Sequence, residues 1–250
     1  MEHAHPTLTM AIIAAGEGSR LKQEGIETPK PLVTIHGEPM IMRLIRMGIR
    51  HGVQQIHVVV NENSRDVLNY LTQQLREIPL NIVIRSTPSS MHSLFALEAF
   101  LHTGPFLLTT VDSIFREAEF AAFLDTARHS TVDGLLAVTH FIDDEKPLCV
   151  VTDTEGRVLQ FSDTVDGCDT ATGGLYWLSP RIFGEIPSAL EADCTRLRNF
   201  LRHLVAHSYD LRTFRFSKMI DVDHASDIEA AEALAAEDEH DNIESVRMSR

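Results

Sequence analysis

Cysteine is scarce in this sequence, and long apolar runs are missing. The 250 residues contain three cysteines, Cys149, Cys168 and Cys194, which are widely spaced and odd in number. That pattern favours free thiols in a reducing compartment over a disulfide framework. No run approaches the roughly 18 apolar residues of a membrane span, and residues 1–6 lack the charged-then-apolar pattern of a secretion signal. We therefore expect a cytoplasmic protein with no membrane partner.

Cations are also in short supply. Lys and Arg number 22 against 36 Asp and Glu, which gives a formal net charge of −14. This charge repels nucleic acid, so we expect no nucleic-acid partner. A protein of this composition that binds phosphates must concentrate its few cations, or a metal ion, at the site. The 13 histidines show no H-E-x-x-H spacing, so we expect most of them to be surface or core residues rather than metal ligands.

A glycine-bearing loop directly follows the first apolar run. Residues 8–15 predict a buried strand, and Gly16 and Gly18 then let backbone N–H groups approach an anion without an intervening Cβ. Arg20 closes the loop, and Lys30 follows ten residues later between two prolines. Both side chains can neutralise an anion, Arg as a fork and Lys as a point charge. These residues predict a site for a polyphosphate.

Two other phosphate-binding loops do not fit. A P-loop requires Lys-Ser or Lys-Thr after a glycine, and the sequence contains neither. A dinucleotide fingerprint requires a third glycine where Leu21 stands, and an acidic residue after the second strand, which here ends at Asn61.

The strings AAGEGSRL (residues 14–21) and TPKPLV (residues 28–33) resemble the signature of the nucleotidyltransferases that include nucleotide-sugar pyrophosphorylases. The second string is of the sugar and choline type rather than the molybdopterin type. The resemblance implies catalytic roles for Arg20 and Lys30. It also implies nucleotide contacts from the loop, namely Ala14, Ala15, Gly16, Glu17, Gly18 and Ser19. The alternative interpretation of the loop is a surface turn with two solvated cations.

Strands and helices alternate through the first half of the chain. The pattern predicts strands over 8–15, 55–60, 80–84 and 106–111 and helices over 39–50, 64–76 and 89–101. This alternation is typical of a doubly wound, mostly parallel three-layer α/β sheet. The fold implied by the resemblance is the same, a Rossmann-like, GT-A-like nucleotidyltransferase.

The second half has more strands with short connections. The pattern predicts helices over 117–127, 180–190, 195–207 and 226–236 and strands over 134–141, 148–152, 158–161, 175–178 and 211–216. The turn at residues 153–156 is a hairpin signal. We expect one domain over residues 1–250, with a nucleotide-binding half (1–115), a small β-rich acceptor-side half (116–236) and a frayed acidic tail (237–250).

Three aspartates are candidate metal ligands. Asp112 ends an apolar strand, and Asp221 and Asp223 lie two residues apart before the last helix. The resemblance implies that Asp112 and Asp223 hold Mg²⁺, an ion usually bound by one or two carboxylates and phosphate oxygens. A helix cap is the alternative role for Asp112, and the choice between Asp221 and Asp223 stays open.

The resemblance weakens on the acceptor side. Many sugar-specific members have a lysine after the hairpin, whereas this chain has Phe-Ser-Asp-Thr-Val at 161–165; Lys146 precedes the hairpin and is not given that role. Ser90 and Ser93 resemble a cytidylyltransferase pattern and are candidate nucleotide contacts, with helix capping as the alternative. Gly174 is a candidate acceptor contact, with a β-bulge as the alternative.

The predicted activity is Mg²⁺-dependent transfer of NMP from an NTP to a phosphorylated small molecule, most often a sugar 1-phosphate, with release of pyrophosphate. A cytidylyltransferase acting on phosphocholine or a similar alcohol phosphate is the alternative within this class. A non-catalytic nucleotide-sensing domain is the alternative of another class. It gains support if Asp112 and Asp223 lie more than about 8 Å apart, because metal–oxygen bonds are about 2 Å long. The NTP, the acceptor and the oligomeric state are not fixed by the sequence.

Overall fold

The computed structural model describes residues 7–74, 78, 80–142, 146–164 and 167–248. Its centre is a nine-stranded sheet with the order β10-β9-β11-β6-β1-β4-β5, in which β8 pairs with β11 and β12. The strands are β1 (Thr9–Ala14), β4 (Gln55–Val60), β5 (Leu80–Ile84), β6 (Phe106–Thr110), β8 (Gly134–Thr139), β9 (Cys149–Thr152), β10 (Val158–Ser162), β11 (Ala171–Leu178) and β12 (Leu211–Phe216). Two small antiparallel pairs stand apart from it, β2 (Thr34–Ile35) with β3 (Glu38–Pro39) and β7 (Ser113–Phe115) with β13 (Met219–Asp221).

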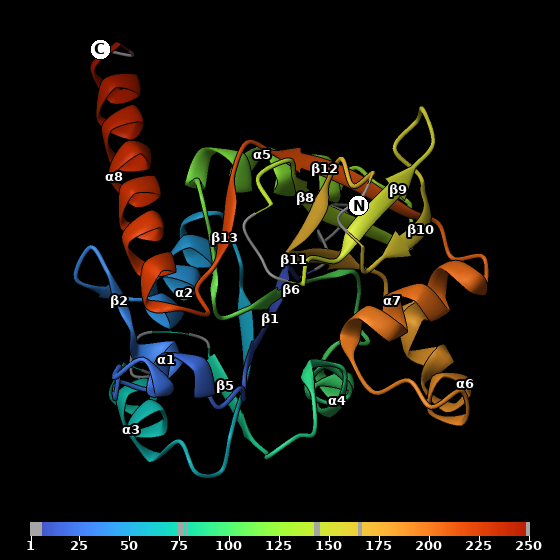
Figure 1. Cartoon of the computed structure of the whole chain (residues 1–250), viewed down its shortest axis with the longest axis horizontal. Coiled ribbons are helices and arrows are strands. Elements are labelled where there is room, and N and C mark those ends of the chain that lie inside the picture. Colours follow the sequence, from blue (N-terminus) through green and yellow to red (C-terminus); the bar gives the residue numbers. More distant parts are fainter. Residues whose placement is uncertain (1–6, 75–77, 79, 143–145, 165–166, 249–250) are drawn as a thin grey trace, which may run out of the picture.

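Helices cover both faces of the sheet (Figure 1). The α-helices are α1 (Ser19–Gln23), α2 (Met40–Arg50), α3 (Arg65–Gln74), α4 (Ser90–Ala96), α5 (Glu117–Arg128), α6 (Ile186–Glu191), α7 (Leu197–Ala206) and α8 (Ala225–Met248), and the 3₁₀ helices are η1 (Lys30–Leu32), η3 (Glu98–Phe100) and η4 (Pro180–Glu185). Strand β1 shows why there are three layers, because successive side chains of a strand point to opposite faces. Its Met10 and Ile12 belong to the core that packs on α2 and α5, and its Ala11 and Ile13 to the core that packs on α4 and α7.

The sheet is parallel where the sequence alternates strand and helix, and mostly antiparallel in the second half of the chain, where β8 and β12 form a further parallel pair. Strand β1 pairs in parallel with β4 and β6, and β4 with β5. Strand β11 pairs antiparallel with β6 and β8, and β9 with β10 forms the hairpin that the turn at 153–156 predicts. The predicted doubly wound, mostly parallel α/β class is thus confirmed.

Several element boundaries differ from the predictions. The single helix predicted over 89–101 is α4 followed by η3. The helix predicted over 180–190 is η4 followed by α6, with Pro187 in the first turn of α6, where its missing N–H costs nothing. Strand β11 begins at Ala171 rather than at residue 175. The predicted end of the helix over 64–76 lies partly outside the described residues.

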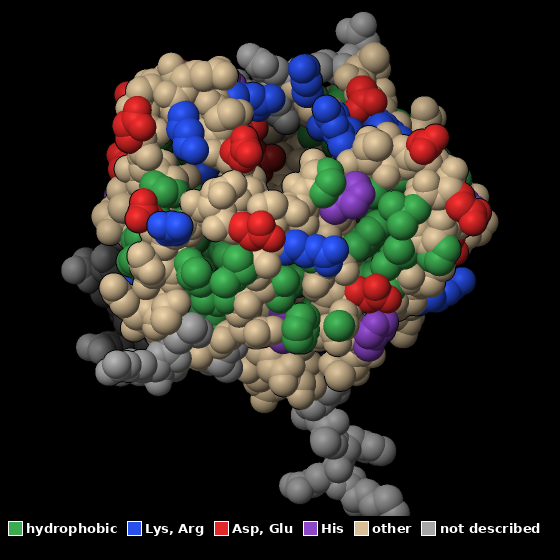
Figure 2. Space-filling view, turned by 90° about the horizontal axis from the view of Figure 1, so that it is seen from below, with side chains coloured by type: hydrophobic (Ala, Val, Ile, Leu, Met, Phe, Trp, Pro, Cys, Tyr) green, Lys and Arg blue, Asp and Glu red, His purple; other side chains and the backbone are tan. Residues whose placement is uncertain are grey.

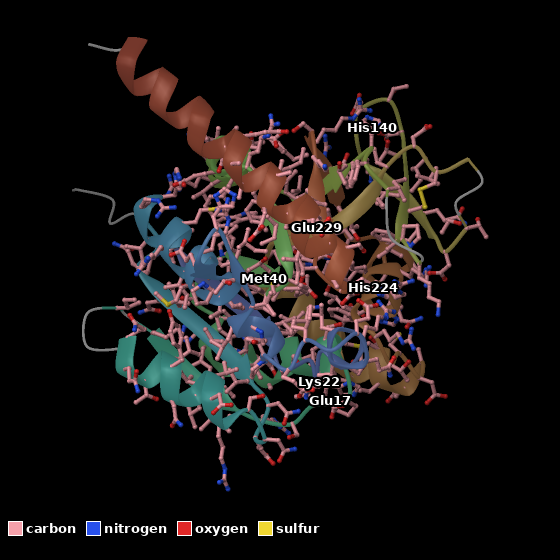
Figure 3. All side chains as sticks on the ribbon, turned by 60° about the vertical axis from the view of Figure 1, so that its left-hand side comes forward. Glu17, Lys22, Met40, His140, His224 and Glu229 are labelled. Carbon is pink, nitrogen blue, oxygen red and sulfur yellow. A yellow bond between two sulfur atoms is a disulfide. The ribbon has the colours of Figure 1, made fainter. Side chains whose placement is uncertain are left out.

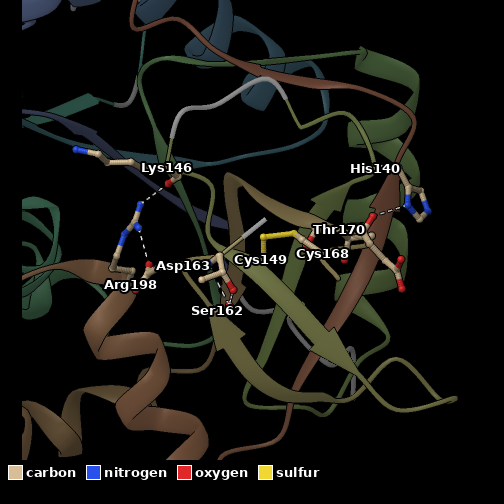
Figure 4. Close-up of a disulfide and its surroundings, with 10 residues drawn as sticks. His140, Lys146, Cys149, Ser162, Asp163, Cys168, Thr170 and Arg198 are labelled. Atoms are coloured by element: carbon tan, nitrogen blue, oxygen red, sulfur yellow. Dashed lines mark hydrogen bonds and ion pairs between the residues drawn. A yellow bond between two sulfur atoms is a disulfide. The ribbon is translucent and has the colours of Figure 1, made fainter. Parts of the chain in front are cut away.

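Two cysteines form a disulfide, so the prediction of three free thiols is wrong. Cys149 in β9 is bonded to Cys168, and Cys194 is free (Figure 4). Cys149 lies opposite Ala171 in the sheet, and the chain that enters β11 therefore brings Cys168 to a Cα–Cα distance of 5.5 Å. The pairing of β9 with β11 brings the two cysteines together, and the spacing of the cysteines along the chain does not reveal it. The cysteine count consequently gives no support to the expected reducing compartment.

The last helix continues beyond its predicted end at residue 236. Helix α8 runs to Met248, and its carboxyl end projects from the body of the molecule (Figures 1 and 3). The tail predicted to be frayed begins as part of this helix: the buried Asp238 side chain accepts hydrogen bonds from the backbone N–H of Glu117, which begins α5. An acid at this place stabilises a helix N-terminus. Among the described residues, no helix is both long and apolar enough to cross a membrane.

Candidate active site

A cavity of about 800 Å³ opens at the carboxyl ends of β1, β4 and β6. Its lining includes the β1–α1 loop, Asn61 after β4, Asp112 after β6, and residues of β11 and α7. The surface of this side of the molecule is hollowed, with acidic and basic side chains around the opening (Figure 2). Open α/β sheets bind ligands at this edge.

The glycine-bearing loop forms one wall of the cavity. Residues Ala15 to Arg20 all line it, whereas Ala14 is buried within β1 and packs in the core. A Cβ added to Gly16 would meet no atom within 4 Å, so the cavity side of this backbone is open. Gly18 has φ of +61°, and a Cβ there would lie 2.9 Å from the Cβ of Lys30. Gly18 therefore lets Lys30 pack directly against the loop.

Lys30 lies at the centre of a buried ion-pair network. Its side chain is 8% exposed, and its Nζ donates hydrogen bonds of 2.5 Å to Asp112 Oδ2 and 2.5 Å to Asp223 Oδ1. Burial alone would lower the pKa of Lys30, but the charges of Asp112 and Asp223 outweigh it and raise this pKa. The same contacts lower the pKa of Asp112 despite the opposing effect of its burial. Lys30 is consequently a fixed cation at any physiological pH.

The chain delivers both aspartates from ordered elements. Asp112 joins β6 to β7, so the alternative that it caps a helix is wrong; the helix that follows, α5, has Arg116 at its N-cap. Asp223 stands between β13 and α8, and its backbone N–H donates to the Asp227 carboxylate at 2.9 Å. Arg20 Nη1 donates to Asp223 Oδ2 at 2.7 Å. The predicted residues Arg20, Lys30, Asp112 and Asp223 thus meet in one place.

The spacing of the aspartates does not favour a sensor domain. The Asp112 and Asp223 oxygens that bind Lys30 are each 2.5 Å from its Nζ, so they lie within about 5 Å of one another. That is inside the limit of about 8 Å beyond which the two could not share one ion.

Asp221 is a third carboxylate beside this pair. It accepts a hydrogen bond of 3.2 Å from the Ser113 hydroxyl, because β13 pairs with β7 and places the two residues opposite each other. Its burial, with the charge of Asp112 nearby, raises the pKa of Asp221 to about 8. Asp112 Oδ1 is buried and has no hydrogen-bond partner among the described residues. The Asp112 and Asp223 carboxylates beside two cations, with one Asp112 oxygen unpartnered, fit a divalent cation.

The remaining predicted residues also line the cavity, but their contacts are with the protein. Ser93 is buried, and its hydroxyl lies 2.6 Å from that of Thr87. Ser90 is the first residue of α4 and lines the cavity. The alternative of helix capping is confirmed only in position. Ser89 occupies the N-cap position of α4, but its hydroxyl contacts His92 instead of a backbone N–H.

Gly174 lies in a β-bulge, which was the alternative to its predicted role as an acceptor contact. The pairing of β11 with β8 shifts between Thr172 and Tyr176, and Gly174 has φ of +74°. A Cβ at Gly174 would meet the Ser113 hydroxyl at 2.1 Å. The glycine is thus required by the close approach of β7, although it also lines the cavity.

Several residues of the lining were not predicted as site residues, among them Asn61, Tyr176 and Arg198. Tyr176 is buried, which raises the pKa of its hydroxyl to about 12. Arg198 in α7 donates hydrogen bonds of 2.8 Å to Asp163 Oδ1 and 2.9 Å to the backbone carbonyl of Lys146 (Figure 4). The only signal for Arg198 in the sequence is a basic residue on an amphipathic helix, which does not indicate the face of the sheet that it reaches.

This fold, with a glycine loop, two cations and a carboxylate pair in one cavity, is that of a nucleotidyltransferase. The chain belongs to the MobA-like NTP transferase domain family, whose model matches residues 10–207. It is accordingly an enzyme that transfers a nucleotidyl group from an NTP to a phosphorylated acceptor, and the predicted family resemblance is confirmed.

Individual relatives are distant. A UTP–glucose-1-phosphate uridylyltransferase of Haloferax volcanii is 22% identical over 178 residues, which cover 69% of this chain and 72% of that protein. A mannose-1-phosphate guanyltransferase of Xenopus laevis is 24% identical over 193 residues, 73% of this chain, which spans only about half (53%) of that protein. The inositol-1-phosphate CTP transferase from T. maritima superposes with a TM-score of 0.78 at 18% identity, over 92% of this chain and 96% of that one. At that identity the likeness shows the fold alone.

Proposed function

We propose that this enzyme transfers NMP from an NTP to a small-molecule phosphate, most often a sugar 1-phosphate, with Mg²⁺ as cofactor and pyrophosphate as the second product. The observation that carries the proposal is the contact of Lys30 with both Asp112 and Asp223 beside the glycine loop. It joins the two requirements of phosphoryl chemistry, a cation for the phosphates and carboxylates for a metal, at one point of the cavity.

Asp112 and Asp223 would hold the Mg²⁺. The buried, unpartnered Oδ1 of Asp112 supports this assignment, because an orphaned carboxylate oxygen costs free energy unless a cation or donor reaches it. Asp221 is adjacent, and its hydrogen bond from Ser113 makes it a supporting residue rather than the first choice of ligand. When bound, the ion would neutralise charge on the phosphate oxygens.

The residues of the chain position the phosphates and neutralise their charge. An oxygen of the acceptor phosphate forms a bond to the α-phosphorus of the NTP, and the bond from that phosphorus to the bridging oxygen of the β-phosphate breaks. The attacking oxygen is already ionised, so the reaction needs no general base. Lys30 and Arg20 would stabilise the charge that gathers on the leaving pyrophosphate, and the Gly16–Gly18 backbone leaves room for the phosphates.

Arg198 is our candidate for the cation that binds the acceptor phosphate. The position at which many sugar-specific members have a lysine is close to Asp163 here, and Asp163 forms ion pairs with Arg198 at 2.8 Å and Arg202 at 2.7 Å. Arg198 lines the cavity together with Tyr176 and Leu148. Figure 1 shows its helix, α7, on the other side of β1 from α1. An arginine fork from α7 would thus replace the missing lysine.

The choice of acceptor rests on the relatives. Those described above are glucose-1-phosphate and mannose-1-phosphate nucleotidyltransferases, which supports a sugar 1-phosphate. The inositol-1-phosphate CTP transferase, together with the serines of α4, keeps an alcohol phosphate with CTP as the second candidate. The sensor alternative loses its support, because all four residues that it predicts to be lost are present and in contact.

The test is release of pyrophosphate with Mg²⁺, with each of the four NTPs against a panel of sugar 1-phosphates, inositol 1-phosphate and phosphocholine. We expect release with one NTP and one acceptor class, abolished in Asp112→Asn and retained in Asp227→Asn at a reduced level, since Asp227 only positions Asp223. Tight NTP binding without release from any acceptor would instead support the sensor domain.

A further inference from the structure

Two histidines and a glutamate form a compact cluster outside the cavity. His203 and His207 lie four residues apart at the end of α7, so they share one face of the helix. Glu185, the last residue of η4, faces them. One ligand atom from each of the three residues lies within 4.8 Å of the other two, and His203 Nε2 is 3.3 Å from Glu185 Oε2. No member of the trio is among the described residues that line the cavity.

Neighbouring groups hold the ligand atoms in place. His207 Nδ1 donates a hydrogen bond of 2.9 Å to the backbone carbonyl of His203, so in the neutral ring the lone pair is on Nε2. Glu185 Oε1 accepts a hydrogen bond from the Tyr209 hydroxyl at 3.2 Å, and Oε2 accepts one from Ser188 at 2.7 Å. Outer contacts of this kind orient the ligands of metal sites.

Glu185 supplies the negative charge of the cluster. Glu185 is ionised at neutral pH, because its hydrogen bonds, that from Ser188 first, lower its pKa. His203 is 8% exposed and contacts Ser188 Oγ at 2.9 Å, so it is anchored, while His207 is exposed and leaves the cluster open to solvent. An ion could therefore enter from solvent and keep a water as its fourth ligand.

We propose that Glu185, His203 and His207 form a binding site for a divalent transition-metal ion, with Zn²⁺ the best match. Two imidazoles and one carboxylate are a ligand set that suits zinc, whereas Mg²⁺ and Ca²⁺ prefer oxygen ligands alone. Zn–N bonds of about 2.0–2.1 Å require the three groups to close in by a small movement of the His207 side chain, which is exposed. His203 and His207 would then be exceptions to the expectation that most of the histidines are surface or core residues.

The ion would join two elements that are separated in sequence by α6. Glu185 comes from η4, and the two histidines from the end of α7, the helix whose first turn carries Arg198. Binding to the folded state alone raises stability in proportion to the logarithm of the ion concentration. The inference stands on its own, because it does not require the proposed transfer reaction.

The test is a zinc titration of thermal unfolding on untagged protein in which His3 and His5 are replaced by Ser. Saturating Mg²⁺ is present throughout, so that the carboxylates of the cavity are occupied. We expect Zn²⁺ to raise the unfolding midpoint and Co²⁺ to develop visible absorption that saturates at one equivalent. His207→Ala should weaken Zn²⁺ binding by more than the roughly tenfold loss typical of removing an outer contact.

Two matched variants complete the design. Glu185→Gln keeps the size of the side chain but removes its charge, and its single carbonyl oxygen can accept only one of the two hydrogen bonds from Ser188 and Tyr209; it should weaken Zn²⁺ binding as His207→Ala does. His129→Ala removes an exposed histidine elsewhere and should leave the zinc titration unchanged. Equal zinc affinity in His207→Ala and the parent, or no zinc-dependent shift in the parent, would overturn the proposal and leave the cluster as a hydrogen-bond network only.

Discussion

The two ends of the cavity are held together by different physical means. At the nucleotide end (the Gly16–Arg20 loop, Lys30, Asp112 and Asp223), ion pairs centred on the buried Lys30, which is 8% exposed, join three separate parts of the chain. At the acceptor end (Tyr176, Arg198, Asp163 and the Cys149–Cys168 disulfide), the ion pairs are exposed, since the Asp163 side chain is 56% exposed, and a covalent bond joins β9 to the start of β11.

This difference has consequences for how each end responds to substitution. Removing one partner of a buried ion pair leaves the other charge unpaired, which lowers the stability of the fold strongly. An exposed ion pair contributes little to stability. The nucleotide end should therefore lose activity and stability together. The acceptor end should lose activity and stability separately, because we expect its stability to depend on the disulfide and propose that Arg198 binds the acceptor.

The largest effect is expected from Lys30→Met. This change keeps the apolar stem but leaves Asp112 and Asp223 without their shared cation. We expect turnover to fall at least about 100-fold and the free energy of unfolding to fall by about 3 kcal/mol. Pyrophosphate release and urea unfolding measure the two quantities. Lys22→Met, on the exposed face of α1 (Figure 3), should change neither, and near-normal turnover in Lys30→Met would contradict the account.

The next effect is loss of the disulfide. Reduction of the Cys149–Cys168 bond, which spans 19 residues of sequence, should lower the free energy of unfolding by about 3 kcal/mol. Urea unfolding with and without a thiol reductant measures this. The double variant Cys149→Ala, Cys168→Ala should be insensitive to the reductant, while Cys194→Ser should keep the full response. A parent protein that is equally stable in both conditions would show that the acceptor end does not depend on this bond.

Arg198→Ala should weaken only the binding of the acceptor. A hydrogen bond to a charged group contributes about 1.5–3 kcal/mol, so we expect the KM for the acceptor to rise roughly 10- to 100-fold and the KM for the NTP to stay constant. Arg202→Ala is the matched control, because Arg202 binds the same Asp163 but is not among the described residues of the lining. Equal effects of the two variants on the acceptor KM would assign Arg198 a structural role.

The smallest effect is a pH dependence at the acceptor end. The hydrogen bond from Arg202, followed by that from Arg198, lowers the pKa of Asp163. A lowered carboxyl pKa stabilises the folded state above the unfolded value of about 3.9, and this contribution is lost as pH falls through the folded pKa. Because Asp163 is largely exposed, the gain is below about 1 kcal/mol. Asp163→Asn should be slightly less stable than the parent at pH 5, and the two should converge near pH 2 in unfolding experiments at low salt. If the difference in stability between Asp163→Asn and the parent stayed constant over this pH range, Asp163 would not be the cause of the pH dependence.

The nucleotide end could be predicted from the sequence because each of its parts carries a local signal. The Gly16–Gly18 loop follows a strand, Lys30 lies between prolines, and Asp112 ends an apolar strand. The parallel sheet then brings these parts to one edge. The same local reasoning gave the strands β4 and β5 with their observed bounds.

The acceptor end could not be predicted in this way, because its contacts join residues without local patterns. Arg198 meets Asp163 only once α7 packs on β10, and Cys149 meets Cys168 only once β9 pairs with β11. The course of α8 beyond residue 236 depends likewise on Asp238 reaching the N-terminus of α5. These contacts form only in the packed tertiary structure, so no local pattern in the sequence indicates them.

The most direct test of nucleotidyl transfer in this cavity is ³¹P NMR of a complete reaction, with Mg²⁺, the NTP, the phosphorylated acceptor and the intact protein. The account predicts that the signals of the α-phosphate and of the acceptor phosphate convert together into one product with a P–O–P link, in equal amounts with pyrophosphate. Lys30→Met should leave both substrates unchanged over the same time. Formation of orthophosphate, or of NMP without consumption of the acceptor, would show hydrolysis instead and contradict the proposed function.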